Sequence, residues 1–125
     1  MKYFFRVAFL IYIVLILWVS LNPSAGISKV DFNESTYRVD YFLHALAFLT
    51  LPILAFFASS TCKTTKLWWV LIGVSTIIAI GTEYLQLVVP DRTFNPLDIL
   101  SNVGGLIVGI LVVVAYKFFQ RLKQE

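Results

Sequence analysis

Four long apolar stretches constrain the fold of this chain more than any other feature. They cover residues of about 4–21, 41–60, 67–89 and 97–119, and a membrane-spanning helix needs roughly 20 such residues. Hydrophobic residues make up 59% of the chain and charged residues only 14%, against about 45–50% and about 25% in soluble domains. Since period-2 alternation is absent and backbone amides in lipid need internal partners, we predict an all-α polytopic membrane protein. It is expected to be one domain, residues 1–125, folded as a compact bundle of four transmembrane helices.

The basic residues predict how this bundle is oriented. With a cytoplasmic N-terminus, seven basic residues fall inside and three outside, which agrees with the positive-inside rule. The inside set is Lys2, Arg6, Lys63, Lys66, Lys117, Arg121 and Lys123, and the outside set is Lys29, Arg38 and Arg92. Both termini are therefore expected in the cytoplasm, and the polar residues discussed next are expected at the extracytoplasmic side.

Glu83 is the most informative polar residue, because it lies inside the third apolar stretch. It precedes Pro90 by seven residues, which would place it roughly 10 Å below the helix end. Carboxylates at such depth normally face the bundle interior and mark function. Gln86, three residues later, shares its helix face. The alternative is a structural glutamate that is protonated, or paired with Arg92, and only holds helices together.

The fourth stretch begins with helix-initiation residues and continues with a small-residue face. Asn95 suits an N-cap, Pro96 the first helical position and Asp98 the third, so capping and the helix dipole explain Asp98 on their own. Asn102 lies four residues further along the same face, and its amide needs partners in lipid. Below it on this face follow two glycines with GxxxG spacing, Gly105 and Gly109, and these predict close helix packing.

Asp40 and His44 lie four residues apart at the start of the second stretch, so they are neighbours on a helix. Asp40 suits a cap, and His44, the only histidine, suits an acid/base role beside a carboxylate. A metal site of Asp40, His44 and Glu83 is disfavoured, because clusters of cysteine and histidine are missing, and we expect no metal and no cofactor. Arg92 is a solvated loop residue, or it neutralises Glu83 or Asp98, or it binds an external anion such as a lipid phosphate or a carboxylate.

The order of these residues resembles the VanZ-like family of small bacterial membrane proteins. Three runs carry the resemblance over nearly the whole chain: Asp40-x-x-x-His44-x-x-x-Phe48, Glu83-x-x-Gln86-x-x-x-Pro90-x-Arg92 and Asp98-x-x-x-Asn102-x-x-Gly105-x-x-x-Gly109. One departure is Tyr41, where many members carry a basic residue. The founding member is linked to teicoplanin resistance, so the resemblance implies a role in the bacterial cell envelope and a place in the cytoplasmic membrane.

Three functions fit these observations. In the first, an outward-facing polar site engages a membrane lipid, a lipid-linked cell-wall precursor or a glycopeptide antibiotic. The residues expected to line it are the catalytic candidates Glu83, His44 and Asp40 and the ligand-binding candidates Arg92, Gln86, Asp98 and Asn102. In the second, the same groups perform acid/base chemistry on a lipid headgroup, with Arg92 holding an anion and Glu83 or His44 moving a proton. In the third, the polar groups only fix helix packing. A small transporter would require the four-helix subunit to oligomerise, and no feature of the sequence predicts a nucleic-acid partner.

Overall fold

The computed structural model contains four α-helices, and all four are long and apolar enough to cross a membrane. They are α1 (Phe4–Leu21), α2 (Val39–Ser59), α3 (Lys66–Gln86) and α4 (Pro96–Leu122). The structure describes residues 3–22, 39–60, 66–90 and 94–124, with only the backbone of residues 39 and 40. The part of the chain so described contains no strand, and the predicted all-α class with four potential spans is confirmed.

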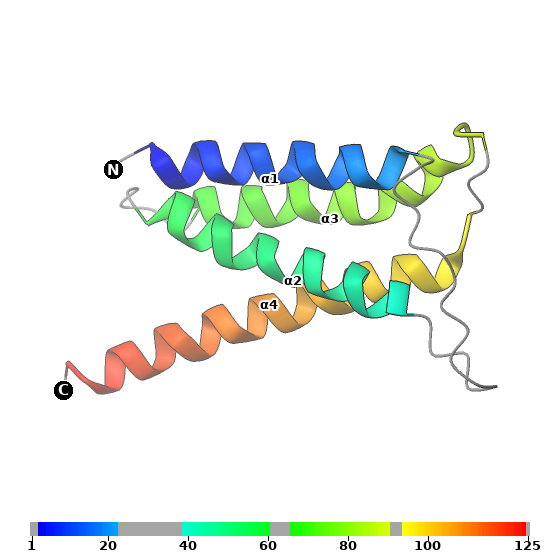
Figure 1. The fold of residues 1–125 in the computed structure, drawn as a ribbon. Helices are drawn as coiled ribbons and strands as arrows, with labels where there is room; N and C mark the ends of the chain where they lie inside the picture. Colours follow the sequence, from blue (N-terminus) through cyan, green and yellow to red (C-terminus); the bar gives the residue numbers. More distant parts are fainter. Residues whose placement is uncertain (1–2, 23–38, 61–65, 91–93, 125) are drawn as a thin grey trace.

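The helices form an antiparallel bundle in which α2 contacts each of the other three helices. Its most extensive contact is with α4. Both termini lie at the same end of the bundle, while the start of α2, the end of α3 and the start of α4 lie at the opposite end (Figure 1). This second end is called the polar end below, because the buried acidic and amide side chains gather there.

Apolar side chains occupy both the inward and the outward faces of the helices, as expected for a bundle surrounded by lipid. The interior is built from buried apolar side chains of all four helices, among them Phe9, Phe48, Leu51, Trp68 and Leu106. Large apolar side chains also cover the outside, for example Leu10, Ile11 and Val14 of α1. An exposed apolar surface of this extent is unfavourable in water, so the distribution of side chains agrees with membrane insertion.

The third helix ends earlier than the apolar pattern predicts. It stops at Gln86 rather than at about Val89, and residues 87–90 form turns. The amides of Leu87, Val88 and Val89 each bond the carbonyl three residues earlier, at 3.1–3.2 Å. Such bonds tighten the last turn of a helix, and Pro90 disfavours helical geometry at the residue before it. Glu83 therefore lies three residues from the helix end, about 4.5 Å along the axis, and not at the greater depth predicted.

The other helix limits shift by no more than the end of α3 does, and the predicted first helix agrees with α1. The second helix begins at Val39, two residues before the predicted start, and ends at Ser59. The fourth continues to Leu122, because Gln120, Arg121 and Leu122 are good helix formers. The apolar pattern predicted that the fourth helix ends at residue 119, because the residues after it are mostly polar.

Close contact between α2 and α4 depends on the two predicted packing glycines. A Cβ atom at Gly105 would collide with the carbonyl oxygen of Ala45, and one at Gly109 with the carbonyl oxygen of Leu49. The facing atoms are backbone atoms, which no side-chain rotation can remove. Gly105 and Gly109 thus allow the two helix backbones to approach closely, as small residues do in membrane bundles.

Candidate functional site

Helix α4 begins at the polar end with the cap that its sequence predicts. The side chain of Asn95 accepts a hydrogen bond from the amide of Leu97 at 3.1 Å, and Pro96 occupies the first turn. The side-chain nitrogen of Asn95, Nδ2, also donates a hydrogen bond to Asp98 Oδ1, at 3.2 Å. Asp98 therefore takes part in the capping region, as expected, yet its side chain is turned inward and is only 6% exposed.

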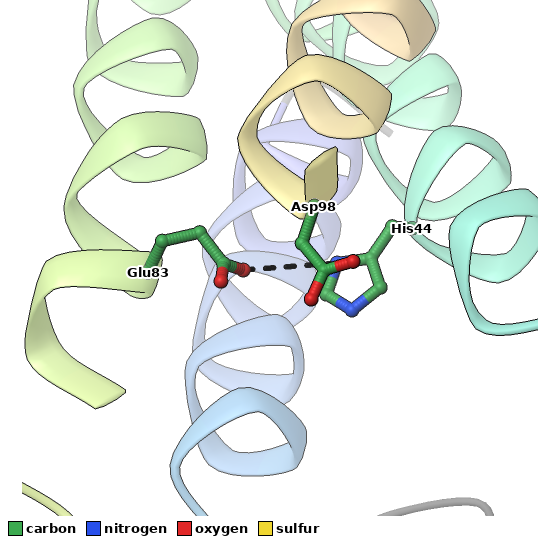
Figure 2. Close-up of side chains that lie close together, drawn as sticks. All are labelled: His44, Glu83 and Asp98. Carbon is green, nitrogen blue, oxygen red and sulfur yellow. Dashed lines mark ion pairs between the residues drawn. The ribbon is translucent and has the colours of Figure 1, made fainter. Parts of the chain in front are cut away.

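Three helices bring an imidazole and two carboxyl groups together at this end. His44 comes from α2, Glu83 from α3 and Asp98 from α4, and their side chains point toward one another (Figure 2). The nearest potential ligand atoms of the three residues lie within 4.8 Å of one another. His44 Nδ1 is 4.0 Å from Glu83 Oε1. We call His44, Glu83 and Asp98 the polar triad.

Burial within the polar triad differs strongly between its members. Glu83 is 0% exposed, whereas the side chain of His44 is 18% exposed. His44 is therefore the most exposed member of the triad. Two ionised carboxylates this close in a buried site would repel each other, and positive charge between them would stabilise that state.

Asn102 connects His44 to the backbone of α3 and determines which ring nitrogen carries the proton. Its Nδ2 donates to the carbonyl oxygen of Ala79 at 3.0 Å, so its Oδ1 is the atom that faces His44. Oδ1 lies 2.9 Å from His44 Nδ1. Because an amide oxygen only accepts hydrogen bonds, Nδ1 must be the donor. In the neutral imidazole, Nε2 then carries the lone pair that accepts a proton or binds a metal ion.

Gln86 is buried at the polar end but belongs to a different contact. Its Nε2 donates to the carbonyl oxygen of Ser20 at 3.3 Å, which joins the end of α3 to the end of α1. Gln86 is buried on the same helix as Glu83. Its placement agrees with a role in joining helices, and its predicted role in ligand binding remains an expectation.

Two candidate residues fall beyond what the structure describes. The side chain of Asp40 and all of Arg92 lie outside the described residues. The expected Asp40–His44 pair and the expected contact of Arg92 with Glu83, Asp98 or an external anion therefore stay predictions.

Sequence reasoning did not single out Tyr41 or Ala79 as parts of the site. The hydroxyl of Tyr41 accepts a hydrogen bond from Asn95 Nδ2 at 3.2 Å, and the carbonyl of Ala79 orients Asn102. Tyr41 lies three residues before His44, on the same helix face. This spacing could have identified Tyr41 as part of the site from the sequence. No side-chain pattern identifies a backbone acceptor such as Ala79.

A comparison with protein families matches most of this chain to one family model. The model is described as VanZ/LLP1 and matches residues 9–119, a range that includes the polar triad, Asn102, Gly105 and Gly109. A search of curated proteins and a search of solved structures gave no match. Because the model covers nearly the whole sequence, the chain belongs to the VanZ/LLP1 family.

Proposed function

We propose that this protein binds the polar headgroup of an envelope lipid or of a lipid-linked cell-wall precursor at the polar end of its bundle. Through this binding it would lower sensitivity to glycopeptides of the teicoplanin type. The observation that carries the proposal is the convergence of buried polar side chains from three apolar helices. Ionisable groups within membrane spans are costly and usually mark binding or proton-transfer sites.

The chemistry of the polar end suits a hydrogen-bonding headgroup. Carboxylates accept hydrogen bonds from hydroxyl and ammonium groups, which are frequent in sugar-containing and amine-containing headgroups. Glu83 lies in the last turn of α3 and Asp98 in the first turn of α4, so both lie near the level at which headgroups meet the hydrocarbon. The partly exposed His44 gives such a group a first contact.

The expected orientation supports an extracytoplasmic site. Both termini lie at the end of the bundle opposite the polar triad (Figure 1), and the basic residues favour cytoplasmic termini. Together these observations support a polar end at the outer surface, where cell-wall precursors and glycopeptides meet. Arg92 is expected near this surface and would add a contact for a phosphate or carboxylate.

Glycopeptide sensitivity tests the proposal in living cells. Strains would carry the wild-type gene, a deletion, Glu83→Gln or the matched control Ser75→Ala, at equal protein amounts in the membrane. Ser75 is as buried as Glu83 on the same helix and bonds only within its helix, to the carbonyl of Leu71. We expect Glu83→Gln to resemble the deletion and Ser75→Ala to resemble wild type. If Glu83→Gln kept the wild-type sensitivity and lowered only stability, the polar groups would have a structural role.

A second candidate function is acid/base chemistry on a lipid headgroup. The specific observation in its favour is the Asn102 contact, which leaves the lone pair of neutral His44 on Nε2. A histidine oriented in this way by a neighbouring acceptor is typical of general bases. Mass spectrometry of lipids and precursors, after expression of wild type or His44→Ala, tests it. Catalysis predicts a species that changes only with wild type, and identical lipid profiles would exclude it.

A further inference from the structure

We propose that the polar triad binds one divalent transition-metal ion of the zinc or manganese type. A ring nitrogen of His44 and one carboxylate oxygen each from Glu83 and Asp98 lie within 4.8 Å of one another, and each comes from a different helix (Figure 2). The sequence disfavoured a metal site of Asp40, His44 and Glu83 because clusters of cysteine and histidine are missing. The fold brings Asp98 to His44 and Glu83, which adds a carboxylate to the possible ligands.

The chemistry of the three ligands indicates the class of metal. Catalytic zinc sites commonly have three protein ligands from histidine and carboxylate side chains, and they keep one position open. Mg²⁺ and Ca²⁺ prefer oxygen ligands throughout, whereas imidazole favours first-row transition metals. One imidazole with two carboxylates therefore fits Zn²⁺ or Mn²⁺ better than Mg²⁺ or Ca²⁺.

Closure around an ion requires rotations of both acidic side chains. Ligand atoms at 2.0–2.2 Å from a tetrahedral ion lie about 3.4 Å from one another. The nearest ligand atoms of the triad lie within 4.8 Å of one another, and the ring nitrogen that pairs with Glu83 in the structure is Nδ1, at 4.0 Å. Rotations about the side-chain bonds of Glu83 and Asp98 would therefore have to bring their carboxylates to Nε2. A dication would also neutralise the charge of the two carboxylates inside the apolar bundle.

Asn102 provides the hydrogen-bond acceptor that metal-binding histidines usually have on the ring nitrogen that does not bind the ion. Such histidines donate their second ring N–H to a fixed acceptor, which sets the tautomer and the ring orientation. His44 Nδ1 has this acceptor in Asn102 Oδ1, at 2.9 Å. The Asn102 side chain is 0% exposed and is itself held by Ala79. Nε2 is thereby the ring nitrogen that would bind the ion.

Metal binding to the purified full-length protein tests the proposal. The protein would be kept in detergent micelles, with any affinity tag removed, stripped with a chelator and dialysed against Zn²⁺, Mn²⁺ or Mg²⁺. We expect about one Zn²⁺ or Mn²⁺ per chain in wild type and in Ser75→Ala. Asn102→Leu removes only the hydrogen-bond acceptor of His44 Nδ1 and should weaken metal binding about 10–100-fold. Glu83→Gln and Asp98→Asn each remove a ligand and should weaken metal binding further. The measurement uses neither lipid nor antibiotic, so its outcome is independent of the proposed function.

A second measurement needs no variant and guards against variants that fail to fold. His44 is the only histidine, so ¹⁵N-histidine labelling gives NMR signals from one imidazole in the wild-type protein. Zn²⁺ should shift the Nε2 signal strongly and leave Nδ1 protonated. The proposal is overturned if Zn²⁺ leaves both ring nitrogens unchanged, or if Glu83→Gln and Asp98→Asn bind the metal as wild type does. Either result would indicate an adventitious ion only.

Discussion

Gly105→Ala is the substitution that tests how the fold assembles the polar end. Gly105 faces Ala45, the residue directly after His44, and lies three residues after Asn102 on α4. The close approach of the two backbones at this point therefore brings Asn102 to His44. A methyl group at Gly105 should separate α2 from α4 and disturb the polar end without changing any polar residue.

The structure allows the size of this effect to be worked out. A Cβ atom at Gly105 would lie 2.8 Å from the carbonyl carbon of Ala45, about 1 Å inside the favourable distance of 3.5–4.0 Å between carbon atoms. A separation of about 1 Å stretches the 2.9 Å contact between His44 Nδ1 and Asn102 Oδ1 beyond hydrogen-bond length. Overpacking costs about 1–3 kcal/mol and a lost hydrogen bond about 1 kcal/mol, so we expect a loss of about 2–4 kcal/mol.

Reversible unfolding in mixed micelles, followed by tryptophan fluorescence, measures this loss. Trp68 is buried in the core and its emission reports on packing. Gly104→Ala is the matched control, because a Cβ atom at Gly104 would meet no atom within 4 Å. The control should leave the free energy of unfolding unchanged or raise it by up to about 1 kcal/mol through helix propensity. Equal effects of the two substitutions would refute the argument that Gly105 sets the distance between α2 and α4.

Three further substitutions test side-chain contacts at the polar end. Asn95→Ala should lower the free energy of unfolding by at least about 1 kcal/mol, because α4 loses its N-cap and the side-chain bonds to Asp98 and Tyr41 are also lost; Ser101→Ala on the same helix, whose hydroxyl bonds only Leu97, is the control, and an equal loss in both would argue against the cap. Gln86→Leu should cost about 0.5–1.5 kcal/mol and loosen the end of α1, which hydrogen exchange at Ser20 and Leu21 would detect; unchanged exchange would contradict the contact. Asn102→Leu should abolish the preference for a proton on His44 Nδ1 in ¹⁵N-histidine spectra, and an unchanged tautomer would show that another group sets it.

Local properties of the chain were predictable from its sequence. The four spans follow from hydropathy, and the start of α4 follows from Asn95 and Pro96, whose capping chemistry acts within one turn. Gly105 and Gly109 were predicted to be packing residues from their spacing alone, and the structure confirms their close approach to α2. The end of α3 was placed too far along, because hydropathy does not register the backbone restriction that Pro90 imposes.

Contacts between helices were less predictable, because they depend on how each helix is rotated about its axis. The sequence placed His44, Glu83, Asp98 and Asn102 at one end of the bundle, since each lies near the appropriate end of an apolar stretch. It did not show that Asn102 bonds His44 or that Asp98 joins the triad. Those contacts require the α2–α4 crossing at Gly105, which is a property of the folded bundle.

Direct measurement of lipid binding tests the central claim that the polar end engages an envelope headgroup. Purified wild type, Glu83→Gln and Ser75→Ala would be mixed with envelope lipids, lipid-linked precursor or teicoplanin, and the bound species identified by native mass spectrometry. We expect wild type and Ser75→Ala to retain a lipid or precursor that Glu83→Gln loses. Equal retention by all three proteins, or binding of the antibiotic alone, would contradict it.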